Sequence, residues 1–170
     1  MTPKSRFLSA CHCQPVDRPP VWLMRQAGRY LPEYQFIRKK LLTKKMMQTP
    51  EVASDITVQP VNLIGVDAAI LYSDILMIPD AMGMGLNFIQ GEGPQFEFAI
   101  DQEAAFSRLK LKNVCDRLSY VFEAVQLSIK KLPENFPLIG FAGAPFTVAC
   151  YMIAGRGRQD TPPSRRRRAD

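Results

Sequence analysis

The sequence predicts an α/β protein in which parallel strands alternate with helices. Three short apolar runs, at residues 21–24, 67–74 and 138–145, are each bounded by polar, glycine or proline residues, which is typical of buried strands. Segments with helical spacing of apolar residues follow each run. An order of strand, helix, strand, helix, strand, helix with continuously apolar strands implies a parallel sheet with right-handed crossovers.

Composition supports an ordinary globular protein. The chain has 170 residues, of which 46% are hydrophobic and 9% aromatic, enough for one domain with a sizeable core. No apolar run approaches the ~20 residues that a membrane-spanning helix needs, and the first residues lack the apolar stretch of a secretory signal. We therefore expect a cytoplasmic protein that uses no membrane as a partner.

The basic charge is concentrated at the end of the chain. The net charge is +6, and residues 155–170 hold six arginines and two aspartates, which leaves +2 for the rest. A basic tail on a nearly neutral body is not the charge pattern of a nucleic-acid-binding domain, so no nucleic acid is expected as a partner.

The helices follow from periodicity and from their end signals. A short helix is predicted over residues 4–13, another over 31–42, and a third begins at Thr49-Pro50-Glu51, with a capping hydroxyl and Pro at the first helical position. This third helix is expected to continue through Pro60 to Ile64 and to stop at Gly65.

The second half of the chain holds a hairpin and two further helices. Residues 75–84 begin as a helix and break at Pro79 and the following glycines. Residues 86–89 and 95–98, separated by a Gly-Glu-Gly-Pro turn, are predicted to form a hairpin insertion. An amphipathic helix is predicted over residues 114–132 and another helix over 146–153.

Two arginines directly after the first predicted strand are candidate ligand-binding residues. Arg25 and Arg29 flank Gly28 at the position where α/β sheets and barrels bind their ligands. A guanidinium at such a place can grip a carboxylate or phosphate through two parallel hydrogen bonds. From spacing alone, a solvated loop with two surface arginines explains the pattern equally well.

The cysteines do not predict a metal site. Cys11-His12-Cys13 has some of the ligand types of a zinc knuckle, but its spacing is too short and the chain has no second cysteine pair. We expect no metal at these residues, and reduced thiols in a cytosolic protein.

The stretch PVWLMRQAGRYLPEY resembles the N-terminal motif of the uroporphyrinogen decarboxylase family. The segments DAAILYSDILMIPDAMGM, GEGP, LSYVFEAV and PLIGFAGAPFTVACYMI are similar to successive segments of the same family, in the same order. The resemblance extends from about residue 3 to residue 153. It implies the N-terminal part of a (β/α)8 TIM-type barrel, with about three βα units plus the hairpin insertion.

The resemblance also implies an activity and a set of site residues. The substrate would be uroporphyrinogen, a cyclic tetrapyrrole with eight carboxylates, from which four are removed as CO2. No cofactor would be needed, because the protonated pyrrole ring accepts the electrons. Family members tend to form homodimers. Asp74 and Arg25 would be catalytic, and the substrate-binding residues would be Arg25, Gln26, Ala27, Gly28, Arg29, Asp74 and Tyr151.

Two of these residues also have a simpler structural interpretation. Asp74 ends the second apolar run, and Asp is a good helix N-cap, so it could serve only to cap the next helix. Tyr151 lies on a mostly apolar helix, where a tyrosine is normally a core residue with its hydroxyl satisfied. The family resemblance favours a place in the cleft for both.

The resemblance ends near residue 153. The family continues there with a Glu and a glycine-rich turn, whereas this chain continues AGRGRQDTPPSRRRR, which is typical of a disordered tail or of a shifted reading frame. We expect a partial barrel domain over residues 1–153 and a basic tail over 154–170, free of core contacts from residue 155. A complete barrel needs about 250 residues. Two alternatives stay open: a cobalamin-linked methyltransferase of the same barrel superfamily, and a truncated or basic-tailed product without catalysis.

Overall fold

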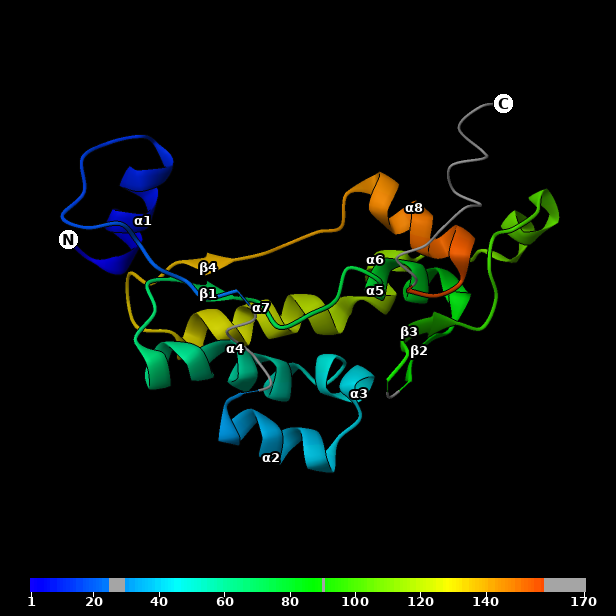
Figure 1. Cartoon of the computed structure of the whole chain (residues 1–170), viewed down its shortest axis with the longest axis horizontal. Coiled ribbons are helices and arrows are strands. Elements are labelled where there is room, and N and C mark those ends of the chain that lie inside the picture. Colours follow the sequence, from blue (N-terminus) through cyan, green and yellow to red (C-terminus); the bar gives the residue numbers. More distant parts are fainter. Residues whose placement is uncertain (25–29, 90, 158–170) are drawn as a thin grey trace. The chain divides into compact units, whose positions relative to one another are not determined.

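The computed structural model describes residues 1–24, 30–89 and 91–157 (Figure 1). The chain forms two compact units. Unit 1 combines Met1–Ser73 with Tyr120–Phe141, and unit 2 combines Asp74–Ser119 with the chain from Ala142 onward. Among the described residues, no helix has both the length and the apolar character required to cross a bilayer.

Unit 1 is built on a short parallel strand pair. Its elements are α1 (Pro3–Cys11), α2 (Pro32–Lys40), α3 (Thr43–Met47), α4 (Pro50–Ile64), β1 (Ala69–Ile70), α7 (Ser119–Lys131, of which the first residue belongs to unit 2) and β4 (Leu138–Ile139). The strands β1 and β4 pair in parallel, with Ala69 opposite Leu138 and Ile70 opposite Ile139. The second and third predicted strands are therefore confirmed as a parallel pair, but both are shorter than the apolar runs.

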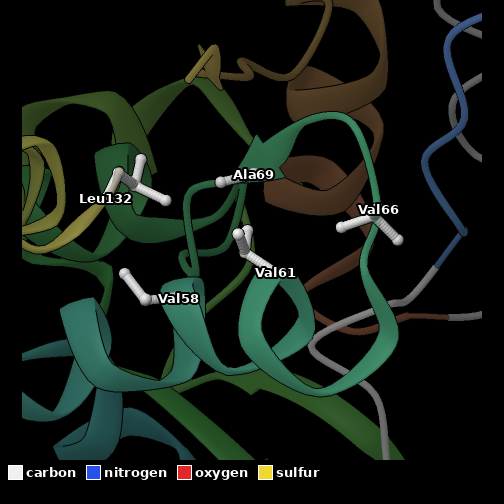
Figure 2. Packing of buried hydrophobic residues seen from close by; sticks show 5 residues of the cluster. All are labelled: Val58, Val61, Val66, Ala69 and Leu132. Carbon is white, nitrogen blue, oxygen red and sulfur yellow. The ribbon is translucent and has the colours of Figure 1, made fainter. Parts of the chain in front are cut away.

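The core of unit 1 lies between α4, α7 and β1. Figure 2 shows Val61 of α4 directed toward Ala69 of β1 and Val58 of α4 directed toward Leu132. Val66 belongs to the same cluster of buried residues. Because α4 packs its apolar face here, the buried Pro60 is tolerated inside the helix, as predicted. Gly65 ends the helix with a φ of 75°, which confirms the predicted left-handed stop.

The predicted capping role of Thr49 is wrong in its detail. Thr49 does occupy the N-cap position of α4, but its side chain makes no capping hydrogen bond. Its hydroxyl instead donates to the carbonyl oxygen of Lys45, 2.8 Å away. The Lys45 carbonyl lies one turn back, in the preceding helix α3, and a threonine hydroxyl readily makes such a local bond.

The first predicted strand is also wrong, because residues 21–24 form no strand and are not buried. Met24 is 79% exposed, and its three predecessors are between 41% and 47% exposed. Asp67 donates its N–H to the carbonyl of Val21 at 2.7 Å, but Val21 donates its own N–H to the Asp67 carboxylate at 2.8 Å. The Asp67 side chain thus accepts the Val21 N–H, which in a strand would donate to the backbone of a neighbouring strand.

The predicted helix over residues 114–132 is divided in two. Helix α6 (Val114–Arg117) ends at Leu118, whose φ of −103° and ψ of 11° are not helical, and α7 begins at Ser119. The guanidinium of Arg117 donates to the carbonyls of Ala81 and Lys110, which ties α6 to unit 2. The helix breaks where its two parts join different units.

Unit 2 contains the hairpin and the last helix. Its elements are α5 (Met77–Pro79), the π-helix η1 (Asp80–Met84), β2 (Leu86–Ile89), β3 (Gly93–Phe96), the 3-10 helix η2 (Glu103–Arg108), α6 and α8 (Pro145–Ala154). Strands β2 and β3 are antiparallel, which confirms the hairpin, although β3 begins two residues earlier than predicted. The core of this unit is formed by Met84, Ile100 and Ala105, with Met152 of α8 packed against them.

The chain after α8 remains attached to the hairpin as far as it is described. Gly155 caps α8 with a φ of 71°, and its carbonyl accepts the N–H of Phe96 at 2.8 Å. Gly157 donates its N–H to the carbonyl of Pro94 at 3.0 Å. Residues 155–157 are therefore hydrogen-bonded to the hairpin and do not leave the fold directly after α8, as an extended tail from residue 155 would. Residues 158–170 lie outside the described part of the chain, so the expected absence of core contacts there stays a prediction.

Candidate functional site

The predicted arginine loop lies outside the described residues. Arg25, Gln26, Ala27, Gly28 and Arg29 are all in the gap between residues 24 and 30. Their assignment as substrate-binding residues, and that of Arg25 as a catalytic residue, stays a prediction from sequence.

Asp74 lies in the segment that follows β1, ahead of α5. Its side chain is half-buried, and its Oδ1 accepts the N–H of Leu76 at 2.8 Å. This contact just before α5 fits the simpler structural interpretation, a local cap. Burial raises the pKa of the Asp74 carboxyl above its usual value, and the bond from Leu76 opposes that rise only in part. The site therefore holds a carboxylate whose charge is poorly solvated, which favours interaction with any positive charge that forms beside it.

The backbone that leads to Asp74 is fixed at Tyr72. Leu71 donates its N–H to Ile139 of β4 at 3.0 Å, which is the last bond of the strand pair. The next N–H, that of Tyr72, donates to the hydroxyl oxygen of Thr57 at 2.9 Å. Thr57 is fully buried on α4. A helix side chain thus anchors the carboxyl end of β1.

A pair of tyrosines lies at the same strand end. The hydroxyl oxygens of Tyr34 and Tyr72 are 3.2 Å apart, and the rings meet edge to face with a centroid distance of 6.0 Å. Tyr34 is buried on α2 among Leu31, Met46 and Ile56. Helix α2 is therefore packed onto Tyr72, which directly precedes Ser73 and Asp74. In the sequence, α2 begins three residues after Arg29.

Tyr151 lies half-buried on α8 in unit 2. Its ring packs beside the backbone that follows the helix, since a Cβ placed on Gly157 would stand 3.3 Å from Cε1 of Tyr151. Within the described residues, no hydrogen bond joins Tyr151 to Asp74. The predicted role of Tyr151 at the edge of a cleft stays a prediction.

A cluster of charged residues joins the N-terminal segment to the start of β1. Arg6 donates to Asp17 at 2.7 Å and to Asp67 at 2.9 Å, and Arg18 donates to both carboxylate oxygens of Asp67 at 2.6 and 2.8 Å. Arg6 and Asp67 are buried. The bonds from Arg18 hold the pKa of the Asp67 carboxyl below its usual value, and Arg6 does the same for Asp17. Because Asp67 also binds the N–H of Val21, the cluster fixes the chain four residues before Arg25.

The candidate metal ligands are not gathered into a site. Cys11 and Cys13 are exposed free thiols at the end of α1. Over the described ranges 1–24, 30–89 and 91–157, no three His, Cys, Asp or Glu side chains come together in a way that could hold a metal ion.

Comparison with known proteins places the chain in a family. The family model for uroporphyrinogen decarboxylase (URO-D) matches residues 2–166. The chain belongs to the uroporphyrinogen decarboxylase family. A protein named uroporphyrinogen decarboxylase from Geobacter metallireducens is 50% identical over 156 residues, and one from Legionella pneumophila is 48% identical over 158 residues. Both alignments cover 92% of this chain and 45% of the relative, so the chain spans about half the length of these relatives.

A solved structure confirms the fold class. A methyltransferase from Methanosarcina mazei matches with a TM-score of 0.72 over 91% of this chain and 46% of that protein, at 21% sequence identity. At this identity the likeness shows the fold alone. Together with membership of the uroporphyrinogen decarboxylase family, it confirms the predicted α/β architecture, part of a (β/α)8 barrel.

Several residues of this region were not predicted from the sequence. Thr57, Tyr34 and Tyr72 were assigned only to helix or strand patterns, and the Arg6–Asp67 pair was not predicted at all. One signal was available for Asp67, a charged residue at the very start of an apolar run, because a buried aspartate needs cationic or N–H partners. Nothing in the sequence identifies which arginines supply them.

Proposed function

We propose that this chain carries the substrate-binding and catalytic residues of a uroporphyrinogen decarboxylase, which converts uroporphyrinogen III to coproporphyrinogen III by releasing four acetate carboxyls as CO2. The observation that carries the proposal is the half-buried carboxyl of Asp74, with its raised pKa, in a chain of this family. Because the chain spans about half the length of its relatives, the activity is proposed for a protein of the relatives' length.

The chemistry requires a site for the electrons of the bond that breaks. Protonation of a pyrrole ring carbon gives a cationic ring, and the electron pair of the bond to CO2 then neutralises that ring. The exocyclic methylene that results takes up a proton to become methyl, and the ring carbon loses its added proton. Each cycle thus replaces one carboxylate by one proton, and the substrate itself supplies the electron sink.

Asp74 is suited to the cationic step. Its carboxylate would accept hydrogen bonds from the pyrrole N–H groups and stabilise the ring cation as it forms. Since burial makes the free carboxylate costly, the gain from a neighbouring positive charge is larger than it would be in water. The stabilisation is therefore greater for the transition state than for the neutral substrate, which is what acceleration requires.

Arg25, Gln26 and Arg29 are proposed to hold the carboxylates that the enzyme does not remove, with Ala27 and Gly28 in the same loop. Arg25 is also assigned a part in catalysis. A guanidinium remains charged at any working pH and binds a carboxylate through two parallel hydrogen bonds. Tyr151 is proposed to border the cleft. On the ground of family membership, we also propose that the protein binds a tetrapyrrole substrate, forms a homodimer and is located in the cytoplasm.

The test uses a completed protein, in which residues 1–157 of this chain are joined to the part of the Geobacter metallireducens relative that follows the matched segment. We expect it to form coproporphyrinogen and CO2 from uroporphyrinogen and to restore haem synthesis in a bacterial strain that lacks its own decarboxylase. The Geobacter half expressed alone is the control. A completed protein that melts cooperatively but forms no coproporphyrinogen would refute the proposed function.

A further inference from the structure

The carboxyl end of β1 is held by hydroxyl groups that have no part in the proposed chemistry. We propose that Thr57 is a positioning residue for Asp74, which it acts on through the backbone of Tyr72, and that the Tyr34–Tyr72 hydroxyl contact supports it. The proposal rests on the proposed function, because it assigns Thr57 an effect on the step in which Asp74 takes part.

The Thr57 hydroxyl has a fixed direction. It donates to the carbonyl of Ala53, one helical turn back, at 2.7 Å, which uses its single proton. Towards Tyr72 it can therefore act only as an acceptor, and it receives the Tyr72 N–H at 2.9 Å. Thr57 is fully buried, so water does not compete for either bond. Loss of the hydroxyl would leave the N–H of Tyr72 without this partner in a poorly solvated place.

The Tyr72 N–H is bound by a helix side chain and not by a strand carbonyl. The N–H of Leu71 points to β4, and the N–H of Tyr72 points to the opposite edge of the chain, because consecutive amides of a strand alternate in direction. On that edge the acceptor comes from α4 rather than from a strand. The direction in which the chain leaves β1 is therefore set by a buried helix, and Asp74 follows after only one intervening residue, Ser73.

The tyrosine pair restrains the side chain of the same residue. Tyr34 is 5% exposed and packed into the α2–α3–α4 cluster, so its hydroxyl is a fixed point for that of Tyr72 at 3.2 Å. Thr57 thus holds the amide of Tyr72, and Tyr34 holds its ring. Because both the amide and the side chain of Tyr72 are restrained, the backbone that continues to Ser73 and Asp74 leaves Tyr72 in one direction.

The main experiment compares Thr57→Val with Thr57→Ser in the completed protein. Valine keeps the shape of threonine but offers no acceptor, whereas serine keeps the hydroxyl and loses only a methyl group. We expect Thr57→Val to lower kcat about tenfold or more, as misplacement of a reacting group by a fraction of an ångström does, and to leave KM within about twofold. Thr57→Ser should stay close to the unsubstituted protein in both constants.

A second set of variants keeps the proposal testable if Thr57→Val does not fold. Tyr34→Phe and Tyr72→Phe each remove the same hydroxyl contact and keep the ring packing. Both variants lose the contact between the two hydroxyl groups, so we expect kcat to fall about two- to fivefold in Tyr34→Phe and at least as far in Tyr72→Phe, with the double variant no slower than Tyr72→Phe. An unchanged kcat in these variants, or effects that add in the double variant, would contradict the supporting role of the pair.

Amide hydrogen exchange supplies a readout that does not depend on activity. The Tyr72 amide should exchange at least about tenfold faster in Thr57→Val than in Thr57→Ser, since an opened hydrogen bond exposes the amide. Equal kcat losses in the two Thr57 variants, or faster exchange in Thr57→Val with kcat unchanged, would overturn the positioning role. An unsubstituted completed protein without activity would instead overturn the proposed function, with the exchange result unaffected.

Discussion

Replacing Asp74 by asparagine separates a catalytic carboxylate from a simple helix cap. The one hydrogen bond that the Asp74 carboxylate accepts within the described residues, from the N–H of Leu76 at 2.8 Å, can also be accepted by an asparagine carbonyl. Asp and Asn are nearly equal as caps. Asp74→Asn should therefore fold normally but lose about 10²–10³ in kcat, the effect of removing one preorganised electrostatic group from a transition state.

The stability of this variant has a defined sign. The pKa of Asp74 in the folded protein is raised above 3.8, so below that pH the carboxyl is neutral in both states and burial costs no charge. The native state loses stability as the pH rises from there through the folded pKa. Above the folded pKa the unsubstituted protein carries the whole penalty of burying the charge. Asp74→Asn removes it, and its melting temperature at pH 7 should equal or exceed that of the unsubstituted protein, with the difference vanishing below about pH 3.8.

The assay is thermal melting at pH 7 together with coproporphyrinogen formation by the completed protein. Asp74→Ala is the matched control, because it loses the cap as well as the charge and should be about 1 kcal/mol less stable than Asp74→Asn. If Asp74→Asn melted several degrees lower and decarboxylated at an unchanged rate, Asp74 would be a cap only and the reasoning would be refuted.

Three further predictions concern binding, stability and the isolated chain. Arg29→Lys should lower kcat/KM markedly, since the lysine ammonium group cannot form the two parallel hydrogen bonds that a guanidinium makes to a carboxylate. An unchanged kcat/KM in steady-state kinetics would show that Arg29 is not part of the site. Asp67→Ala should lower the free energy of unfolding in urea by about 3 kcal/mol at pH 7, the low end for breaking a buried pair, because Arg6 keeps Asp17 and Arg18 is half exposed. Since the Asp67 pKa is lowered, that stabilisation is present above pH 3.8 and is lost as the pH falls through the folded pKa, so the two proteins should converge in acid. The 170-residue chain alone should aggregate and show no decarboxylase activity, because β4 has β1 as its one strand partner among the described residues and its other edge is open; a soluble, cooperatively melting, active chain would contradict this.

Local sequence determined most of the helices and the hairpin. Pro50 at the first helical position and Gly65 with its left-handed backbone fixed the two ends of α4, and the internal Pro60 did not prevent it. The glycines that surround the turn of the hairpin, Gly91 and Gly93, have φ values of 85° and 87°, which few other residues adopt. These features depend on the conformational preferences of neighbouring residues, and for that reason they are visible in the sequence. The motif around residues 20–34 also identified the family, which the comparisons confirm.

The tertiary structure decided which partner each remaining hydrogen-bonding group found. The Asp67 carboxylate lies 46 residues from Val21 in the sequence and takes its N–H, so an apolar run that predicts a strand forms none. Arg117 is held by carbonyls of unit 2, and the predicted long helix breaks at Leu118. Thr57 supplies the acceptor at the end of β1 from a helix 15 residues away. A sequence pattern gives the preference of a segment for a helix or a strand. It does not say which distant polar group will satisfy a buried donor, because that depends on where folding brings the two together.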